Sequence, residues 1–228
     1  MSKGILKIVA TPIGNMGDIT LRAIETLKTA DLVLSEDTRE TDKLLKRLNI
    51  TAKQISYRDE NHNRVFDVIK GYLDDGKTLV LVSDSGTPLI SDPGYKLVSE
   101  LLALDYAVEA IPGPSSVIAA LVVSGLPTDK FSFLGFLPRD KGPRIKLLSS
   151  YGATESTLVI FESPYRVAKL LDQTLAAVGD RECALVNDIT KKFEKVWRGK
   201  VSKVLSDINT INLKGEFIFV LAKDDYGR

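Results

Sequence analysis

Residues 79–94 have the sequence LVLVSDSGTPLISDPG, a short apolar run followed by a loop of small and polar residues. The run Leu79–Val82 is typical of a strand that is buried on both faces of a sheet. In open α/β sheets, ligands bind beyond the carboxyl ends of the strands, where this loop would lie. Its glycine allows close approach of backbone, and its Asp84 carboxylate can accept hydrogen bonds from ribose hydroxyls. An ordinary strand-to-helix connection explains one such loop equally well.

The residues around this stretch repeat its pattern of strand, loop and helix. Five alternations fit into the first 125 residues, which predicts a parallel, doubly wound sheet. Loops containing Gly14, Gly86 and Gly113 follow three of the strands, so all three should lie on one edge of the sheet and form a rim for a ligand. The strands are expected at residues 5–10, 32–34, 54–57, 79–82 and 108–111.

The second half of the chain predicts a separate α/β domain with a mixed sheet. Its strands are expected at residues 131–137, 157–161, 183–186, 193–197 and 217–221. No helix separates the third of these from the fourth, so those two should form an antiparallel pair. The segment Leu126-Pro127-Thr128 marks the boundary, giving predicted domains of residues 1–125 and 126–228.

Composition places the chain among globular proteins, with 228 residues, 44% hydrophobic and 27% charged. The longest apolar run, Val117–Val123, has seven residues, well short of the roughly 18 that cross a membrane. No signal peptide is expected, and the single cysteine, Cys183, cannot form an internal disulfide. We therefore expect a cytoplasmic protein with no membrane segment, and Cys183 as a small buried strand residue.

The net charge of +1 hides an asymmetry between the two halves. Residues 1–124 carry 14 basic and 17 acidic side chains, whereas residues 125–228 carry 17 basic and 13 acidic ones. Basic clusters at residues 139–146 and 191–203 are what binding to a polyanion requires, although such clusters are also common on solvated surfaces. The candidate RNA-binding residues are Arg139, Lys141, Arg144, Lys191, Lys192, Lys195 and Arg198.

Several common sites are absent from the sequence. It contains no GxxxxGK[ST] segment and no GxGxxG after the first strand, which argues against P-loop hydrolysis and the usual dinucleotide site. One His, one Cys and no carboxylates at ligand spacing argue against a transition-metal site, and His62 in a polar loop is expected to be solvated or hydrogen-bonded. Glu36 and Asp37, at a strand end, could hold a hydroxyl or cap the next helix.

Eight short motifs occur together in a consistent order between residues 6 and 221. With them, the chain resembles the small-subunit ribosomal RNA methyltransferases of the tetrapyrrole methylase superfamily. The resemblance implies two α/β domains, usually in a homodimer, with S-adenosylmethionine bound in the cleft between them. The motifs are TPIGN (11–15), SEDTR (35–39), SDSGTP (83–88), ISDPG (90–94), PGPS (112–115), GFLP (135–138), FESP (161–164) and KGEF (214–217).

The same resemblance implies 2′-O-methylation of a cytidine ribose in small-subunit (16S) ribosomal RNA, with Glu36, Asp37 and Arg39 as candidate catalytic residues. Asp84 is a third candidate base and Lys191 a second candidate orienting group, but an aspartate that holds the ribose of the cofactor cannot also be the base. The implied cofactor-binding residues are Pro12, Gly14, Ser83, Asp84, Gly86, Thr87, Pro88, Ser91, Pro112, Gly113, Ser115, Ser116, Phe161 and Gly215.

Three departures and two alternatives accompany this prediction. Relatives usually have Ala at Ser85, His at Tyr165 and Arg-Glu at Asn187-Asp188, so no catalytic role is assigned to Tyr165, Asn187 or Asp188. A tetrapyrrole (precorrin-type) C-methyltransferase is one alternative, and the basic clusters and the motifs after Gly135 argue against it. The other is a non-catalytic RNA- or nucleotide-binding module with the same fold.

Overall fold

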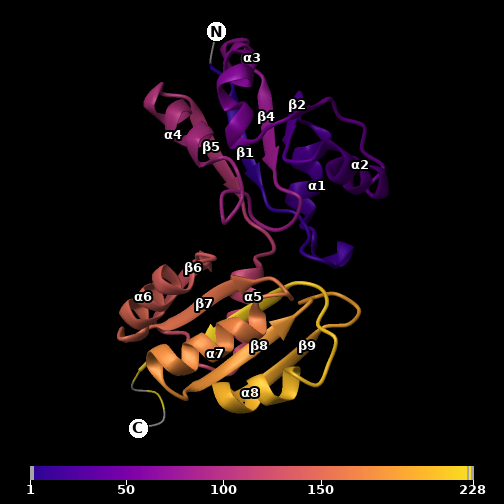
Figure 1. The fold of residues 1–228 in the computed structure, drawn as a ribbon. Helices are drawn as coiled ribbons and strands as arrows, with labels where there is room; N and C mark the ends of the chain where they lie inside the picture. Colours follow the sequence, from indigo (N-terminus) through magenta and orange to yellow (C-terminus); the bar gives the residue numbers. More distant parts are fainter. Residues whose placement is uncertain (1–2, 225, 227–228) are drawn as a thin grey trace. The chain divides into compact units, whose positions relative to one another are not determined.

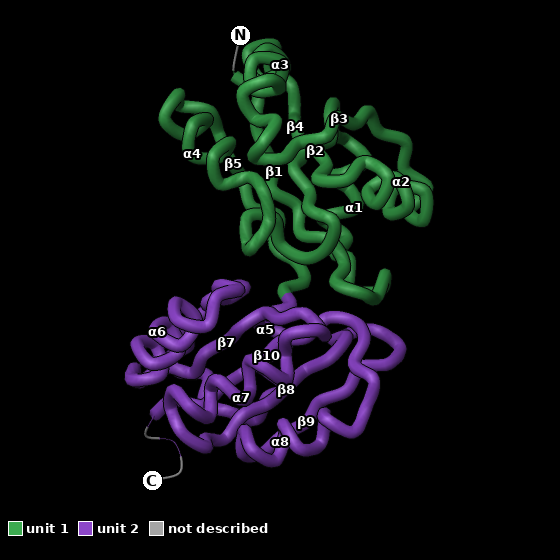
Figure 2. Tube along the Cα trace, viewed as in Figure 1, with its two compact units in different colours: residues 1–115 green, residues 116–228 purple. Residues whose placement is uncertain are grey.

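The computed structural model describes residues 3–224 and 226 of the chain. These residues form two compact units, one within residues 1–115 and the other within residues 116–228 (Figure 2). Each unit is built on a five-stranded sheet with helices packed on it (Figure 1). This confirms the predicted fold class of two α/β domains, the first with a parallel sheet and the second with a mixed one.

The first unit contains a sheet with strand order β3-β2-β4-β1-β5, and every neighbouring pair is parallel. The four strands β2, β4, β1 and β5 are adjacent, so their carboxyl ends meet at one edge, as the sequence predicts. The elements are β1 (Ile5–Val9), η1 (Met16–Asp18), α1 (Leu21–Lys28), β2 (Leu32–Ser35), α2 (Thr38–Arg47), β3 (Gln54–Ser56), η2 (Asp59–Asn61), α3 (His62–Asp74), β4 (Thr78–Val82), α4 (Tyr95–Ala103) and β5 (Ala107–Ile111).

Alternating side chains of these strands form two apolar layers. On one face, the leucines of β1, β2 and β4 pack against Ile69 and Leu73 of α3 and against Leu97 and Leu101 of α4. On the other, valines of the same strands pack against α1 and α2. The Thr20 hydroxyl accepts a hydrogen bond from the Ala23 N–H and thereby caps α1. Helices on both faces leave the carboxyl-end edge as the place for a ligand.

The second unit contains a mixed sheet with strand order β6-β7-β10-β8-β9. β6 and β7 are parallel, whereas β10 pairs antiparallel with both β7 and β8, and β9 pairs antiparallel with β8. The antiparallel pair predicted from the missing helix is therefore confirmed. The elements are α5 (Ser116–Ser124), β6 (Phe131–Phe136), α6 (Lys141–Gly152), β7 (Thr157–Glu162), α7 (Val167–Val178), β8 (Glu182–Asn187), β9 (Lys195–Lys200), α8 (Val201–Ile208) and β10 (Phe217–Leu221).

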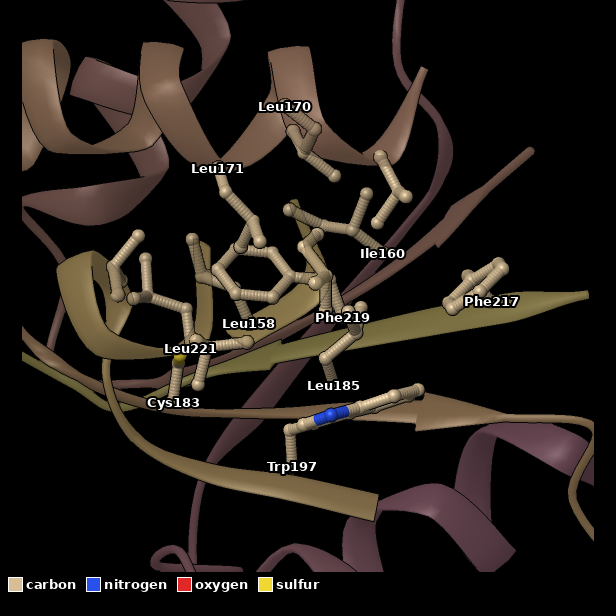
Figure 3. Close-up of a cluster of buried hydrophobic side chains, with 14 of the residues drawn as sticks. Leu158, Ile160, Leu170, Leu171, Cys183, Leu185, Trp197, Phe217, Phe219 and Leu221 are labelled. Carbon is tan, nitrogen blue, oxygen red and sulfur yellow. The ribbon is translucent and has the colours of Figure 1, made fainter. Parts of the chain in front are cut away.

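The core of the second unit lies between this sheet and helices α6, α7 and α8. Phe217, Phe219 and Leu221 of β10 are its central layer, and Leu170 and Leu171 of α7 cover them (Figure 3). Burial of one such side chain is worth about 1.5–3 kcal/mol, so this layer is a major source of stability. The opposite face of the sheet is covered by α5, which packs on β8, β9 and β10.

This packing explains the largest difference from the predicted organisation. The two compact units divide between Ser115 and Ser116, earlier than the predicted boundary after residue 125. Helix α5 follows β5 in the sequence, but it is apolar on most of its surface and packs on the mixed sheet. Sequence order alone assigned it to the preceding strand. A smaller difference is that β9 begins at Lys195 and not at Phe193.

The one histidine and the one cysteine of the sequence are both buried. His62 is buried at the start of α3; its ring nitrogens lie 3.0 Å from the Tyr57 hydroxyl and 2.9 Å from a Glu100 carboxylate oxygen. Of the two environments expected for His62, the structure shows the hydrogen-bonded one. Cys183 is buried in β8, where burial raises the pKa of its thiol to about 12.

No helix among the described residues has the length and apolar character needed to span a membrane.

Candidate functional site

The carboxyl-end edge of the parallel sheet gathers four loops, which we call the first rim (residues 11–15, 36–37, 83–94 and 112–115). Loop 11–15 and loop 83–94 are joined by a short antiparallel bridge, in which Thr11 N donates to Gly86 O at 2.8 Å and Gly86 N donates to Thr11 O at 3.1 Å. The Thr87 hydroxyl donates to the Pro114 carbonyl at 3.0 Å and ties in the third loop. The sequence prediction that these loops lie together is confirmed.

Two glycines permit this close packing of backbone. Gly86 has φ +77°, a conformation that L side chains rarely adopt, and an added Cβ would also approach Ile13 to 3.2 Å. At Gly113 an added Cβ would lie 3.0 Å from the Cβ of Ala10. Any larger residue would push loop 112–115 away from β1. Glycine at these two positions therefore lets the loops of the rim pack this closely on one another.

The rest of loop 83–94 contains strained backbone. Leu89 and Ser91 have φ +73° and +68°, in the left-handed region that branched or bulky residues avoid. Such conformations cost on the order of 1–3 kcal/mol each and occur most often at ligand sites. Asp59 holds the end of the loop, because its carboxylate accepts a hydrogen bond from Gly94 N at 3.2 Å. This hydrogen bond anchors the carboxyl end of the loop, next to the start of α4.

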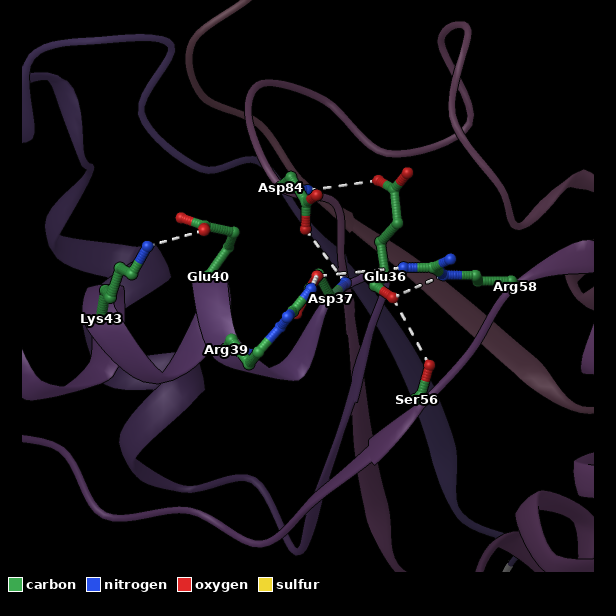
Figure 4. Close-up of polar contacts among 8 residues, drawn as sticks. All are labelled: Glu36, Asp37, Arg39, Glu40, Lys43, Ser56, Arg58 and Asp84. Carbon is green, nitrogen blue, oxygen red and sulfur yellow. Dashed lines mark hydrogen bonds and ion pairs between the residues drawn. The ribbon is translucent and has the colours of Figure 1, made fainter.

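A group of carboxylates and guanidinium groups lies beside this loop (Figure 4). Asp37 caps α2 by accepting from Arg39 N at 2.9 Å, and its carboxylate also accepts from the Arg39 guanidinium at 2.6 and 3.0 Å. These hydrogen bonds hold the pKa of Asp37 well below its ordinary value. The capping role considered for Asp37 is therefore observed, and its carboxylate is a weak base.

Glu36 has the opposite character. Burial raises the pKa of its carboxyl, and the negative charge of Asp84 adds to this effect, while the Asp84 N–H, 3.4 Å away, lowers the pKa in part. Its backbone carbonyl accepts from Arg58 Nε at 3.0 Å and from the Ser56 hydroxyl at 3.4 Å, which fixes this position at the end of β2. A carboxylate with a raised pKa and a fixed backbone has the properties of a general base.

Asp84 connects these two carboxylates to the glycine-containing loop. One of its oxygens accepts from Asp37 N at 3.0 Å, and the side chain is otherwise exposed. Burial raises its pKa, and the neighbouring Asp37 carboxylate raises it further. The remaining lone pairs are free to accept hydrogen bonds from a ligand hydroxyl.

Two residues at the first rim were not among the predicted site residues. Burial raises the pKa of Asp92 to about 6, and the charges of Glu36 and Asp84 add to this shift. Arg58 contacts the Glu36 carbonyl, lies 4.0 Å from the Asp37 carboxylate and lines a surface hollow of about 370 Å³ with Glu60, Asn61 and Arg64. Asp92 lies in the ISDPG motif, so the sequence could have indicated it. Arg58 lies in a polar segment that contains none of the quoted motifs.

We expect Asp92→Asn to increase thermal stability at alkaline pH and not at acidic pH. The raised pKa means that the native state disfavours ionised Asp92, so stability is lost as the pH rises from about 4 through about 6. The amide removes this penalty, so the melting temperature should rise at about pH 8 and stay unchanged at about pH 4. Asp67→Asn, on the exposed surface of α3, is the matched control. Equal shifts of the Asp92 variant at both pH values would contradict the assignment.

The predicted cofactor residues of the second unit lie near its sheet edge. The Phe161 ring packs edge-on against Phe133 and Phe136, with centroid distances of 4.8 and 5.6 Å. Gly215 has φ +84°, and an added Cβ would collide with the Asp188 carboxylate. The assignment of Phe161 and Gly215 to a cofactor site stays a prediction.

The basic residues do not all remain available for RNA. Arg144 is wrong as an RNA contact: it is 1% exposed, and its guanidinium donates to the carbonyls of Pro138 and Arg139 at 2.8 and 2.7 Å. Lys191 bridges Asp188 and Glu216 at 3.1 and 2.8 Å, and Arg198 donates to the Val123 carbonyl. Arg139, Lys141, Lys192 and Lys195 are exposed and stay candidates.

The residues that depart from the family pattern have clear environments. Tyr165 is 94% exposed at the turn before α7. The Asn187 amide donates to the carbonyls of Lys214 and Glu216 at 2.9 and 3.2 Å, and Asp188 accepts from Glu216 N at 3.3 Å. Asn187 and Asp188 thus organise the start of β10, while Tyr165 has no structural role of this kind.

Comparison with known proteins gives one family. Residues 6–205 match the model of the Tetrapyrrole (Corrin/Porphyrin) Methylases. The chain is 44% identical over 220 residues to "Ribosomal RNA small subunit methyltransferase I" of Synechocystis, covering 96% of this chain and 79% of that protein. A protein of the same name from Thermotoga maritima is 43% identical over 219 residues, covering 96% of this chain and 98% of the relative.

Solved structures with the same fold are more distant in sequence. A diphthine synthase aligns with a TM-score of 0.72 and 15% identity over 96% of this chain and 90% of its own. Uroporphyrin-III C-methyl transferase from Thermus thermophilus, complexed with S-adenyl homocysteine, aligns with a TM-score of 0.67 and 21% identity over 97% and 98% of the two chains. At these identities the likeness shows the fold alone.

Proposed function

The chain belongs to the tetrapyrrole (corrin/porphyrin) methylase family, and from this premise we propose that it transfers a methyl group from S-adenosylmethionine to the 2′-hydroxyl of a cytidine in small-subunit ribosomal RNA. The observation that carries the proposal is the first rim, where fixed backbone loops and a carboxylate with a raised pKa lie on one sheet edge. The relatives named for ribosomal RNA methylation support the substrate.

The residues of the first rim fit such a methyl donor. Its ribose needs hydroxyl acceptors, which the exposed Asp84 carboxylate offers. Its sulfonium is a cation, and Glu36, Asp84 and Asp92 give the rim a negative charge near the glycine-containing loops. When bound, the donor supplies a methyl group that its own positive sulfur already activates.

The other predicted cofactor residues have supporting roles in this proposal. Gly86 and Gly113 present backbone, and the Thr87 hydroxyl fixes loop 112–115 through the Pro114 carbonyl. Ser83 lies at the end of β4, where its hydroxyl donates to the Ser85 carbonyl at 3.1 Å. Pro12, Gly14, Pro88, Ser91, Pro112 and Ser115 complete the proposed set in the first unit.

Among the three catalytic candidates, the geometry favours Glu36 as the base. A ribose hydroxyl is a poor nucleophile, and a positioned base contributes about 10²–10⁴-fold to the rate. In the proposed reaction, Glu36 takes the hydroxyl proton while the oxygen forms a bond to the methyl carbon and the carbon–sulfur bond breaks. The Asp37 carboxylate and the Arg39 guanidinium are hydrogen-bonded to each other. Their proposed role is therefore to orient Glu36 and the RNA backbone.

Transfer of radiolabelled methyl groups tests the proposal directly. Purified small ribosomal subunits that lack the modification should accept label from S-adenosylmethionine in the presence of this protein. Label in a tetrapyrrole and not in RNA would favour the C-methyltransferase alternative. Binding of RNA and S-adenosylmethionine without any transfer would favour a non-catalytic module.

We expect salt to weaken RNA binding far more than binding of S-adenosylmethionine. Each phosphate contact with a single strand contributes about −0.7 to the slope of log K against log salt, so four contacts predict an RNA affinity about 50-fold lower at about 200 mM than at about 50 mM. The four proposed contacts are Arg139, Lys141, Lys192 and Lys195. Fluorescence anisotropy with labelled RNA and calorimetry with the methyl donor measure the two slopes, and equal slopes would contradict a basic RNA face.

The proposal also includes the cellular location and the oligomeric state of the protein. A ribosomal substrate implies a cytoplasmic enzyme, and the family resemblance implies a homodimer. Light scattering of the purified protein measures the oligomeric state, with twice the 25.0 kDa chain mass as the expected result.

A further inference from the structure

Four connections meet at one edge of the second sheet, which we call the second rim (residues 137–140, 163–166, 188–194 and 214–216). The registers place them there. Phe136 of β6 pairs with Phe161 of β7, Glu162 pairs with the first residue of β10, and Asn187 pairs both with that residue and with the first residue of β9. Strands lie about 4.8 Å apart, so five of them span about 19 Å.

Three exposed aromatic side chains lie along this edge of the sheet. Tyr165 is 94% exposed and Phe193 is 77% exposed, and Phe136, at the end of β6, is 59% exposed. Large apolar side chains in a soluble protein are normally buried, so a group of them at one sheet edge indicates a binding surface. Tyr165 follows β7 and Phe193 follows β8. In the sheet, β10 lies between these two strands.

The loop that carries Phe193 contains strained backbone and several internal contacts. Asp188 and Thr190 have φ +48° and +64°, an unfavourable conformation for residues other than glycine, above all for β-branched Thr190. Thr190 N donates to the Glu194 carboxylate at 2.6 Å, and Lys191 joins the loop to Asp188 and Glu216. These contacts restrain the backbone on either side of Phe193, so less conformational entropy is lost when a ligand contacts its ring.

Two lysines near Phe193 each lie over an aromatic ring. Lys192 lies 5.5 Å from the Phe193 ring centroid, and Lys195 lies 4.6 Å from the centroid of Trp197. Within residues 3–224 and 226, neither lysine forms an ion pair, whereas Lys191 forms two. No carboxylate of the described residues neutralises either ammonium group, so both can attract phosphates. The combination of exposed aromatic rings and free cations is typical of surfaces that bind single-stranded nucleic acid.

We propose that the second rim binds an unpaired segment of the RNA substrate, with Phe193 and Tyr165 stacking on bases and Lys192 and Lys195 contacting phosphates. This inference rests on the proposed function for the identity of the polymer, and it adds the residues that recognise single-stranded character. Phosphate contacts alone would bind any duplex equally well, whereas stacking requires bases that are not paired.

Binding of a fluorescein-labelled, 12-nucleotide single-stranded oligocytidylate tests the stacking role. Phe193→Ala should weaken binding about 5- to 150-fold at constant salt, since one stacked base is worth about 1–3 kcal/mol. Phe193→Tyr should bind like the wild type, because it keeps the ring. Phe193→Ala should also leave the salt slope unchanged, whereas Lys192→Ala should reduce that slope by about 0.7. The exposure of Phe193 means that folding should be unaffected, which circular dichroism checks.

Phe131→Ala is the matched control. Phe131 is 40% exposed and begins β6, at the opposite edge of the same sheet, so its removal should not change binding. Wild-type affinity for both Phe193→Ala and Tyr165→Ala, or an equal loss for Phe131→Ala, would overturn the inference. Methyl transfer by the wild type is measured separately. If transfer is absent but binding depends on Phe193, the proposed function fails and the RNA surface stands; if transfer occurs and binding ignores Phe193, only the surface fails.

Discussion

Glu36→Gln is expected to lower kcat for methyl transfer by about 10²–10⁴-fold, with the affinity for S-adenosylmethionine changed by no more than about threefold. The amide keeps the size of the side chain and an oxygen that can accept from Asp84 N, as the carboxylate does at 3.4 Å. It cannot take a proton from the ribose hydroxyl. Because burial raises the pKa of Glu36, wild-type kcat should also rise with pH as this carboxyl ionises, and the variant should lack that rise.

Two variants show whether the loss is specific to Glu36. Glu40→Gln removes another carboxylate of α2 that is exposed and paired with Lys43 at 2.7 Å, and it should keep full activity. Asp37→Asn retains a capping oxygen and should lose at most about tenfold, because Asn and Asp cap helices similarly. Near-normal kcat in Glu36→Gln, with a large loss in Asp37→Asn, would contradict the assignment of the base.

Asp84→Ala is expected to weaken S-adenosylmethionine binding about 10- to 100-fold, as measured by calorimetry. A hydrogen bond to a charged group contributes about 1.5–3 kcal/mol, and Asp84 presents an exposed carboxylate from loop 83–94, beside Asp37. Ser85→Ala is the matched control, because Ser85 is exposed and its contact with Ser83 is through the backbone carbonyl. Unchanged affinity in Asp84→Ala would remove this residue from the proposed cofactor site.

The sequence was sufficient to predict the first sheet because each of its strands is a local signal. Runs such as Leu79–Val82 are apolar on both faces, and glycine-containing loops mark their carboxyl ends. In a parallel sheet these ends must share one edge, so proximity of Gly86 to Thr11 follows from topology. The first rim could therefore be anticipated before its contacts were known.

Features set by tertiary packing could not be predicted in this way. Helix α5 follows β5 in the sequence but packs on the second sheet, which moved the division of the units to Ser115. Arg144 has the charge expected of an RNA contact. The structure shows instead that its buried guanidinium donates to the carbonyls of Pro138 and Arg139. The sequence predicted Phe193 as the first residue of a strand. In the structure β9 begins at Lys195, and Phe193 is an exposed loop residue.

The location of the transferred methyl group tests the central claim most directly. Small ribosomal subunits would be labelled with methyl-tritiated S-adenosylmethionine and this protein, and their RNA hydrolysed in alkali. Hydrolysis needs a free 2′-hydroxyl, so methylation there leaves the adjacent phosphodiester intact. Our account predicts that the label is recovered in an alkali-stable dinucleotide that contains cytidine. Recovery of the label in single nucleotides would place the methyl group on a base and contradict ribose methylation.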